Sequence, residues 1–235
     1  DKVFVDPKLR THTFCHAVPG MWHIMGVMLS AGGSLRWYRD TFGEMEISIS
    51  RLLGEDPYDI LCQEAENIKP GAEGLIFLPY LTGERCPYPD PFARGVFFGI
   101  GLNHKRSHFV RSIIEGISFG LNDSFNILRE LGVKPESVKV SGGGARSQLW
   151  RKILASIFDL PVVTINVTEG AAFGSALLSA VGTGHFRSVT EAAESMVDVT
   201  GITEPEKDWV ETYRELYPLY KKLYSDLKED FRFKT

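Results

Sequence analysis

Hydrophobic positions recur every three or four residues in three long segments, which is the spacing of one buried helix face. The segments are 107–131, 147–158 and 209–227. Ser107 and Ser147 are typical N-cap residues at the first two starts, and Gly132 is a typical stop for the first helix. Pro218 lies inside the third segment, so we expect that helix to bend or break there.

Shorter helices and strands are predicted between these segments. Asp56–Pro57 supplies a cap followed by proline at the first helical position, and it opens a helix that ends near Asn67. Helices are also expected over 34–42 and over 169–184, the second of which is made largely of small residues. Short β-branched and aromatic runs predict strands. These strands are 75–81, 96–100, 138–140 and 162–167.

Two extended stretches over 11–28 surround Pro19–Gly20 and predict a β-hairpin. Pro-Gly suits a type II turn, so we expect a loop longer than two residues. In this register His16 and His23 would lie opposite each other on one face. Tetrahedral zinc needs converging ligands, and the hairpin offers two or three imidazoles, so a packed histidine pair is favoured over a metal site.

Composition fits one large domain. The chain has 235 residues, 43% of them hydrophobic and 24% charged, which is enough to bury a full core. Helices and strands alternate after the hairpin, which indicates the α/β class. The net charge of −4, with acids and bases mixed along the chain, disfavours a nucleic-acid partner. The longest apolar runs are of strand length, which disfavours a membrane partner.

The cysteines indicate the cellular location of the chain, and its first residues indicate whether it is part of a longer protein. Cys15, Cys62 and Cys86 are too few and too scattered for a disulfide framework, so reduced thiols and a cytoplasmic location are predicted. The chain starts at Asp1 without an initiator Met or clear periodicity. We therefore expect it to begin inside a longer protein.

Three adjacent glycines stand out in the stretch VKVSGGGARSQLW, residues 138–150. Glycine reaches positive φ freely and leaves bare backbone on which another group can lie. A strand, a glycine turn and a capped helix together form a common ligand seat in α/β proteins. A tight turn packed beneath a neighbouring loop explains the same residues, and this stretch alone does not decide between the two.

The sequence lacks the motifs of several common enzyme classes. The chain has no nucleophile elbow and no P-loop ending in Gly-Lys-Ser/Thr. The glycine run is not G-x-G-x-x-G, and Asn166 stands near the position where a dinucleotide-binding protein carries an acidic residue. A dinucleotide dehydrogenase is therefore disfavoured, and the motifs supply no catalytic base, phosphate-gripping lysine or pair of metal carboxylates.

Two sets of charged residues can be explained by structure or by function. Those of the proline-rich loop 82–95 either bind a charged substrate or tie the loop to its own backbone. Arg111 and Glu115 are four residues apart and predict an ordinary surface pair, while Gly116 beside them predicts close helix packing. The loop's charged residues are Glu84, Arg85, Asp90 and Arg94.

Several segments together resemble the C-terminal domain of the FGGY carbohydrate kinases, within the actin-like ATPase superfamily. GVFFGIGLNHKRSHFVRSIIE (95–115) fits the family's second sequence pattern at every specified position. GGGARSQLW followed by LPV resembles the family's adenosine-binding turn and helix, and EGAAFGSALLSAVGTG (169–184) resembles its closing helix. Within the family, segments 12–38 and 79–95 look most like xylulokinases.

The resemblance implies an actin-like ATPase (ribonuclease H-like) fold of the α/β class, with a mixed β-sheet flanked by helices. Residues 1–235 would be one C-terminal nucleotide-binding domain, which closes on an N-terminal domain across a cleft. The sugar site, the catalytic aspartate and most magnesium ligands belong to that other domain. The resemblance therefore implies no catalytic residue and no metal site in this chain.

The residues that match the family's nucleotide site form two walls. Gly142, Gly143, Gly144 and Ala145 would form the turn against adenine and ribose, so the turn would face adenosine rather than phosphate. The helix that Ser147 opens follows that turn. The residues matching the other wall are Gly32, Gly33 and Arg36.

The implied activity is phosphoryl transfer from ATP to D-xylulose, which gives D-xylulose 5-phosphate, with ATP and Mg²⁺ as cofactors. The expected partners are ATP or ADP, a pentulose bound through the other domain, and a second copy in a homodimer. This half alone is expected to be inactive. The alternatives are a kinase of the same family for glycerol, ribulose or gluconate, and a non-catalytic nucleotide-binding module of actin-like architecture.

Overall fold

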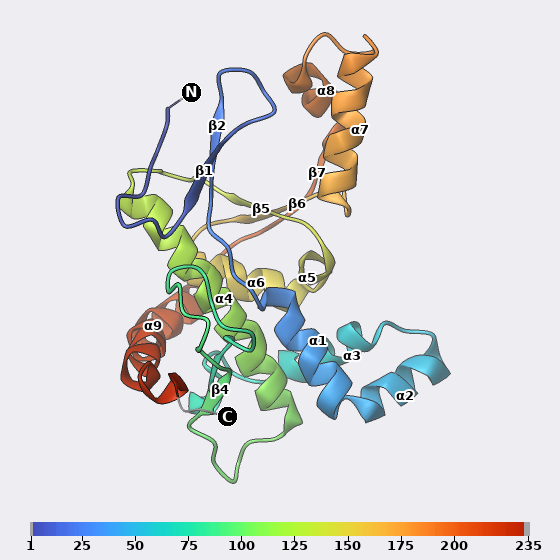
Figure 1. The fold of residues 1–235 in the computed structure, drawn as a ribbon. Helices are drawn as coiled ribbons and strands as arrows, with labels where there is room; N and C mark the ends of the chain where they lie inside the picture. The colour runs from blue at the N-terminus through green and yellow to red at the C-terminus, as the bar shows by residue number, and fades with distance from the viewer. Residues whose placement is uncertain (1, 233–235) are drawn as a thin grey trace.

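The computed structural model describes residues 2–232, in which long helices form the centre and three small sheets lie around them (Figure 1). The helices are α1 (Ala31–Phe42), α2 (Glu44–Leu53), α3 (Pro57–Glu66), α4 (Arg106–Glu130), α5 (Gly143–Arg146), α6 (Gln148–Phe158), α7 (Gly170–Gly182), α8 (Val189–Met196) and α9 (Lys207–Leu227). Short 3-10 turns cover Ala72–Gly74 and Asp230–Arg232.

The strands pair in three separate sheets. β1 and β2 form one antiparallel pair and β3 and β4 another, while β5, β6 and β7 form a mixed sheet in which β5 and β6 are parallel. Parallel neighbours need a crossover, and α6 supplies it between β5 and β6. The strands are β1 (His12–Cys15), β2 (Trp22–Met25), β3 (Ile76–Leu78), β4 (Val96–Phe98), β5 (Val138–Val140), β6 (Val162–Ile165) and β7 (Val199–Thr203).

The middle of α4 is the centre of the core. Every residue from Val110 to Gly120 is buried, because β3, α1, α3 and α6 all pack against this helix. Gly116 lies directly against β3, and a Cβ atom at this position would stand 2.2 Å from the carbonyl oxygen of Phe77. The close packing predicted at Gly116 is confirmed.

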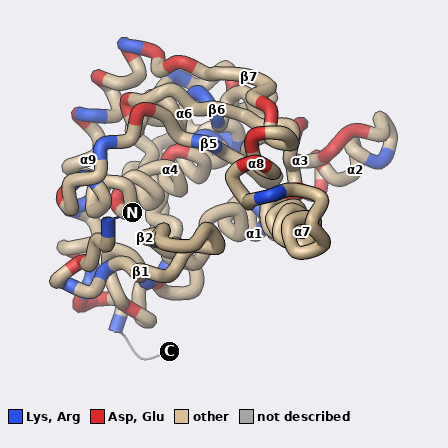
Figure 2. The backbone as a smooth tube through the Cα atoms, turned by 90° about the horizontal axis from the view of Figure 1, so that it is seen from above, with Lys and Arg blue, Asp and Glu red and all other residues tan. Residues whose placement is uncertain are grey.

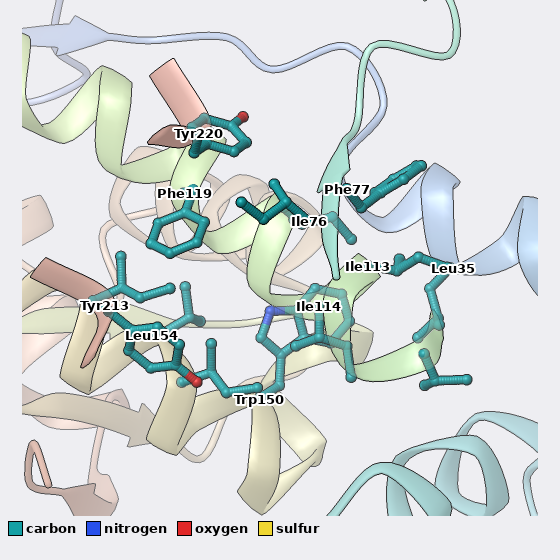
Figure 3. Close-up of a cluster of buried hydrophobic side chains, with 14 of the residues drawn as sticks. Leu35, Ile76, Phe77, Ile113, Ile114, Phe119, Trp150, Leu154, Tyr213 and Tyr220 are labelled. Atoms are coloured by element: carbon teal, nitrogen blue, oxygen red, sulfur yellow. The ribbon is translucent and has the colours of Figure 1, made fainter. Parts of the chain in front are cut away.

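Aromatic rings join α4 to α9. Figure 3 shows Phe119 between Tyr213 and Tyr220, and its ring centroid lies 5.8 Å and 5.2 Å from theirs. The hydroxyl of Tyr220 lies 3.1 Å from that of Tyr80, so its polar end also has a partner inside the core. This packing anchors α9, which continues through Pro218 as one helix, so the predicted break does not occur.

The predicted N-caps of α3 and α6 are confirmed, because in both the capping side chain bonds to the first turn of its own helix. Asp56 accepts a hydrogen bond from the backbone N–H of Tyr58 at 2.9 Å, with Pro57 as the first residue of α3. Ser147 accepts one from the N–H of Trp150 at 3.2 Å and so caps α6. Both caps satisfy N–H groups that would otherwise lack a partner within the helix.

The predicted cap of α4 is wrong by two residues. The N-cap is Lys105, not Ser107, and the backbone N–H of Lys105 donates to Nδ1 of His108 at 3.1 Å. This is a capping-box geometry with histidine in the role that glutamate or glutamine usually has. The sequence pattern selects the serine because a hydroxyl is the commoner cap.

α1 begins earlier than predicted, at Ala31 instead of Ser34. The backbone N–H of Ser34 bonds to the carbonyl of Ser30 at 3.0 Å, which extends the helix backward through Gly32 and Gly33. The two glycines thus stand in the first turn of a helix, where they leave bare backbone.

Three predicted strands are shorter in the structure. β3 ends at Leu78, before Pro79, which cannot donate to a ladder. β4 ends at Phe98, since Gly99 has a φ of +87°. The strand predicted over 162–167 ends at Ile165, where its register with β7 shifts. We did not predict α2, α8 or β7.

The hairpin is confirmed, but its histidine register is not. The N–H of Met21 donates to the carbonyl of Val18 at 3.1 Å, and Gly20 has a φ of +78°, as a type II turn requires. His23 stands opposite Phe14, not His16. His16 is therefore diagonal to His23, because the loop adds residues between the strands.

The pair Arg111–Glu115 is buried, which corrects the prediction of a surface pair. Arg111 Nε lies 2.6 Å from Glu115 Oε1, and their side chains are 0% and 4% exposed. Glu115 also accepts hydrogen bonds from the hydroxyl of Tyr213 at 2.8 Å and from the N–H of Gly71 at 3.0 Å. Burial raises the pKa of Glu115, and Arg111 opposes that shift.

The charged residues of loop 82–95 hold the loop in place. Glu84 accepts hydrogen bonds from the N–H groups of Leu29 and Arg85, at 3.1 Å and 2.7 Å. Asp90 accepts from the hydroxyl of Tyr224 at 3.0 Å and from the N–H of Phe92 at 2.9 Å. Arg94 donates to the carbonyls of Pro91 and Ala93. These contacts support the interpretation that Glu84, Asp90 and Arg94 hold the loop in its conformation.

Candidate functional site

A cavity of about 360 Å³ lies where the start of α1, the start of α3 and the α5–α6 turn meet. Its volume is within the range of small-molecule sites, about 300–1,000 Å³. Its lining residues are Gly32, Gly33, Leu35, Arg36, Asp56, Tyr58, Asp59, Cys62, Gly143, Gly144, Arg146, Ser147 and Trp150.

The cavity brings together the two walls predicted from the sequence. Gly32, Gly33 and Arg36 come from α1, while Gly143, Gly144 and Ser147 come from a segment more than a hundred residues further on. Gly142 and Ala145 belong to the same turn but are outside the lining. The carbonyl of Gly142 accepts a hydrogen bond from the N–H of Ala145 at 3.1 Å, so these two residues stabilise the turn.

Bare backbone faces open space on both walls. A Cβ atom built on Gly32 or Gly33 would have no described atom within 4 Å, and the same holds for Gly142 and Gly143. Gly144 differs, because its Cβ would stand 3.2 Å from the ring of Trp150. A flat group can therefore approach the peptide planes at Gly143, while Gly144 fits against the floor.

The chain reaches this geometry through a sharp exit from β5. Gly142 has a φ of +82°, a conformation that side chains disfavour, and it turns the chain into the single helical turn α5. Ser147 then opens α6. Arg151 donates to the carbonyls of Ala145 at 2.5 Å and Arg146 at 2.9 Å, which holds the turn on α6.

The floor of the cavity is apolar and its rim is charged. Leu35, Cys62 and Trp150 are buried beneath it, and burial raises the pKa of the Cys62 thiol, which keeps it neutral. Tyr58 lies on the rim, with the guanidinium of Arg39 4.7 Å from its ring centroid. A flat apolar body with polar edges is the ligand shape that such a site accommodates.

Arg146 joins the end of the glycine turn to the start of α3. Its guanidinium lies 3.3 Å from a carboxylate oxygen of Asp56 and 3.4 Å from one of Asp59. All three side chains are partly exposed, so these pairs leave Arg146 free to exchange partners at little cost. Sequence reasoning gave Asp56 a cap role alone and assigned nothing to Asp59 or Arg146, because no spacing relates residues on two distant helices.

Arg36 is a further cation at the cavity. It is exposed, and no hydrogen bond or ion pair joins its side chain to any residue between 2 and 232. An exposed guanidinium beside open backbone is available to an anionic group of a ligand.

The described residues also bear on metal binding and on membrane insertion. In the described part of the chain, no three His, Cys, Asp or Glu side chains are placed to hold a metal ion. Each helix between residues 2 and 232 is too short or too polar to cross a membrane.

Comparison with known proteins shows the family to which this chain belongs. Residues 3–183 match the C-terminal domain of the FGGY family of carbohydrate kinases. This chain belongs to that family. The chain is 36% identical to the xylulose kinase of Staphylococcus epidermidis over 218 residues, which covers 93% of this chain and 42% of that protein. It is 37% identical to the gluconokinase of Bacillus licheniformis over 233 residues, 98% of this chain and 45% of that one.

A solved relative has the same fold. The ligand-bound xylulose kinase from Lactobacillus acidophilus superposes with a TM-score of 0.82 at 28% identity, over 98% of this chain and 45% of that structure. The predicted class, an α/β actin-like ATPase domain with a mixed sheet flanked by helices, is confirmed. The chain spans less than half the length of these FGGY relatives.

Proposed function

We propose that residues 1–235 are the C-terminal, nucleotide-binding domain of an ATP-dependent sugar kinase. The observation that supports this most is the open backbone at Gly32–Gly33 and at Gly143 beside Arg36, whose side chain has no partner among residues 2–232, in a member of the FGGY family. The purine would lie on the peptide planes of the glycine turn, above the apolar floor. Ser147 and Arg146 would border it, and Arg36 would face the ribose or phosphate side.

The reaction we propose is transfer of the γ-phosphoryl group of ATP to a hydroxyl of D-xylulose. The hydroxyl oxygen bonds to phosphorus, the bond to the ADP oxygen breaks, and the proton passes to a carboxylate outside this chain. Catalysis of this kind depends on positioning and charge stabilisation. The contribution of this chain is to fix the nucleotide at one end and to exclude water when a second domain closes over it.

Magnesium would neutralise phosphate charge when bound. The described residues hold no group of three side chains that could bind a metal ion, and the two cavity carboxylates, Asp56 and Asp59, pair with Arg146, so we propose that most magnesium ligands belong to the other domain. We propose that the sugar-binding residues lie there too, because this chain spans less than half the length of its FGGY relatives. We place the protein in the cytoplasm, where ATP and sugar phosphates are available.

Gluconate is the second candidate substrate, because a gluconokinase shares 37% identity with this chain over almost its full length. A phosphorylation assay of the full-length protein with D-xylulose, gluconate, ribulose and glycerol distinguishes these substrates. We expect the fastest transfer with D-xylulose and no transfer to any sugar by the 235-residue chain alone. ADP binding without activity on any of these sugars would favour the non-catalytic module. Phosphorylation by the isolated chain would contradict the proposal that the catalytic carboxylate lies outside it.

A further inference from the structure

Glu84 joins the proline-rich loop to the start of α1. Its Oε1 atom accepts hydrogen bonds from the backbone N–H of Leu29 at 3.1 Å and from that of Arg85 at 2.7 Å. In addition, Oγ of Ser30 lies 2.8 Å from Oγ1 of Thr82. Two consecutive residues, Leu29 and Ser30, are therefore bonded to a loop that lies more than fifty positions further along the chain.

The start of α1 has no cap from its own sequence. Ser30 is the N-cap residue, but its hydroxyl bonds to Thr82 and accepts no hydrogen bond from the first turn of the helix. An N-cap side chain ordinarily fixes that turn. In this chain the position of the first turn depends instead on the bonds to the loop.

The first turn of α1 carries one wall of the nucleotide cavity. Gly32 and Gly33 follow Leu29 by three and four residues, and both leave open backbone at the cavity. Arg36 stands about one turn further on. A helix moves largely as a unit, because each N–H is bonded to the carbonyl four residues earlier. Glu84 is not among the described residues that line the cavity, so it acts on a ligand only through α1.

Glu84 is a buried carboxylate held by backbone groups. The residue is 4% exposed, and Leu29 and Arg85 bond to it through their backbone N–H groups. Burial raises the pKa of Glu84, and these hydrogen bonds oppose that shift. The hydrogen bonds therefore offset only part of the free energy that burying the carboxylate costs. Such costs are typical of functional sites, where geometry matters more than stability.

Asp90 is the natural comparison, because it belongs to the same loop and is similarly buried, with 6% exposed. Backbone hydrogen bonds of 2.9 Å and 3.0 Å pair it with Glu84. Its side chain accepts from the hydroxyl of Tyr224 on α9. Figures 1 and 2 show α9 and α1 on opposite sides of α4. The two acids thus bind one loop in two directions, and of the two it is Glu84 that bonds to the segment opening α1.

We propose that Glu84 is a positioning residue of the nucleotide site. Through the N–H of Leu29 it fixes the first turn of α1, so that the wall at Gly32–Gly33 keeps its distance from the turn at Gly143. This inference rests on the proposed nucleotide-binding function. Removal of the carboxylate should therefore lower the affinity for nucleotide, and not the stability of the fold alone.

Calorimetric titration of the full-length protein with ADP, below the melting temperature of every variant, tests this role. Glu84→Ala removes the acceptor and should weaken ADP binding about tenfold, the effect of losing about one charge-assisted hydrogen bond. Glu84→Gln keeps an acceptor oxygen for Leu29 and should bind within about threefold of the wild type. Asp90→Ala is the matched control. It removes a buried carboxylate from the same loop and should change ADP affinity by less than about twofold.

Wild-type ADP affinity in a folded Glu84→Ala protein overturns the proposal, and so does an equal loss in Asp90→Ala. A Glu84→Gln protein as weak as Glu84→Ala overturns the role assigned to the two hydrogen bonds. If Glu84→Ala does not fold, Glu84→Asp repeats the test with the same expected loss, because its side chain is one methylene too short to reach Leu29. A wild type that binds no ADP contradicts the proposed function and, with it, this inference.

Hydrogen exchange gives a second readout that does not depend on nucleotide. Backbone amides over 29–36 should exchange faster in Glu84→Ala than in the wild type, because the first turn of α1 loses its bond to the loop. The same amides should exchange at the wild-type rate in Asp90→Ala. Unchanged exchange over 29–36 in Glu84→Ala overturns the proposal.

Discussion

Arg146, at the end of the glycine turn, pairs with Asp59 on α3, with 3.4 Å between Nη2 and Oδ2, and both residues line the candidate nucleotide cavity. A second contact of 3.3 Å joins it to Asp56. Arg146 is 90 positions from Asp56 and 87 from Asp59 in the sequence, so their contact ties together two segments of the cavity lining that are far apart along the chain.

We expect Arg146→Ala to weaken ADP binding about tenfold, which is the worth of one charge-assisted hydrogen bond. Stability should hardly change, since exposed ion pairs contribute between about 0 and 1 kcal/mol. Isothermal titration calorimetry and thermal melting measure the two effects. Arg214→Ala is the matched control. Arg214 forms a similar exposed ion pair with Asp159, with 3.5 Å between the charged groups, and neither residue lines the cavity. Equal ADP affinity for both variants would show that Arg146 does not contact the nucleotide.

Gly116→Ala should destabilise the chain although alanine is the better helix former. The added methyl would stand 2.2 Å from the backbone oxygen of Phe77, and overpacking of this kind costs about 1–3 kcal/mol. Gly174→Ala in α7 is the control, because its methyl meets no described atom within 4 Å and should add up to about 1 kcal/mol. Urea unfolding of the two variants should therefore give changes of opposite sign. A stabilised Gly116→Ala would contradict the packing described between α4 and β3.

Glu115→Gln should cost about 3–5 kcal/mol, because it leaves the buried guanidinium of Arg111 without its counter-charge. Nη1 of Arg111 already lacks a hydrogen-bond partner among the described atoms. The double variant Arg111→Met/Glu115→Leu removes both charges and should lose less than the single variant. Denaturant unfolding compares them, and a double variant that is less stable than Glu115→Gln would disprove this account.

Asp123→Asn should stabilise the protein at neutral pH. Burial raises the pKa of Asp123 from 3.8 to about 6, against the opposing effects of Tyr217 and Lys221. The folded state thus holds a proton that the unfolded state has released, so the contribution of Asp123 to stability falls as pH rises from about 4 to about 6. Asparagine does not titrate and retains an acceptor for the Tyr217 hydroxyl.

The free energy of unfolding of Asp123→Asn minus that of the wild type isolates this group from the other buried acids. We expect the difference to grow by roughly 1–3 kcal/mol between pH 4 and pH 6 and then to stay constant. A difference that is flat over this interval would mean that Asp123 keeps an ordinary pKa in the folded state.

Signals that act within a few residues were predictable from the sequence. The caps Asp56 and Ser147 and the turn at Pro19–Gly20 each bond to their own neighbours, so composition and spacing suffice. The family resemblance located both glycine walls before the structure placed them around one cavity.

Features that depend on distant partners were not predictable. Residues 45–50, Met-Glu-Ile-Ser-Ile-Ser, alternate with a period of two, yet they form α2 because Arg106 pairs with the buried Glu46. Arg111 and Glu115 have the spacing of a surface pair, and only the packing of Tyr213 around them shows that they are buried. The bridge from Arg146 to α3 depends on the fold in the same way.

In the proposed site the nucleotide lies on the bare backbone at Gly143, and calorimetric titration of Gly143→Val with ADP tests this contact most directly. A Cβ atom at this position would meet no described atom within 4 Å, so the fold should persist while the isopropyl group enters the cavity. Gly182→Val, at the end of α7 and equally unobstructed, is the control for the helix propensity of valine. We predict that Gly143→Val weakens ADP binding at least about tenfold and that Gly182→Val does not. Wild-type affinity in a folded Gly143→Val variant would contradict the account.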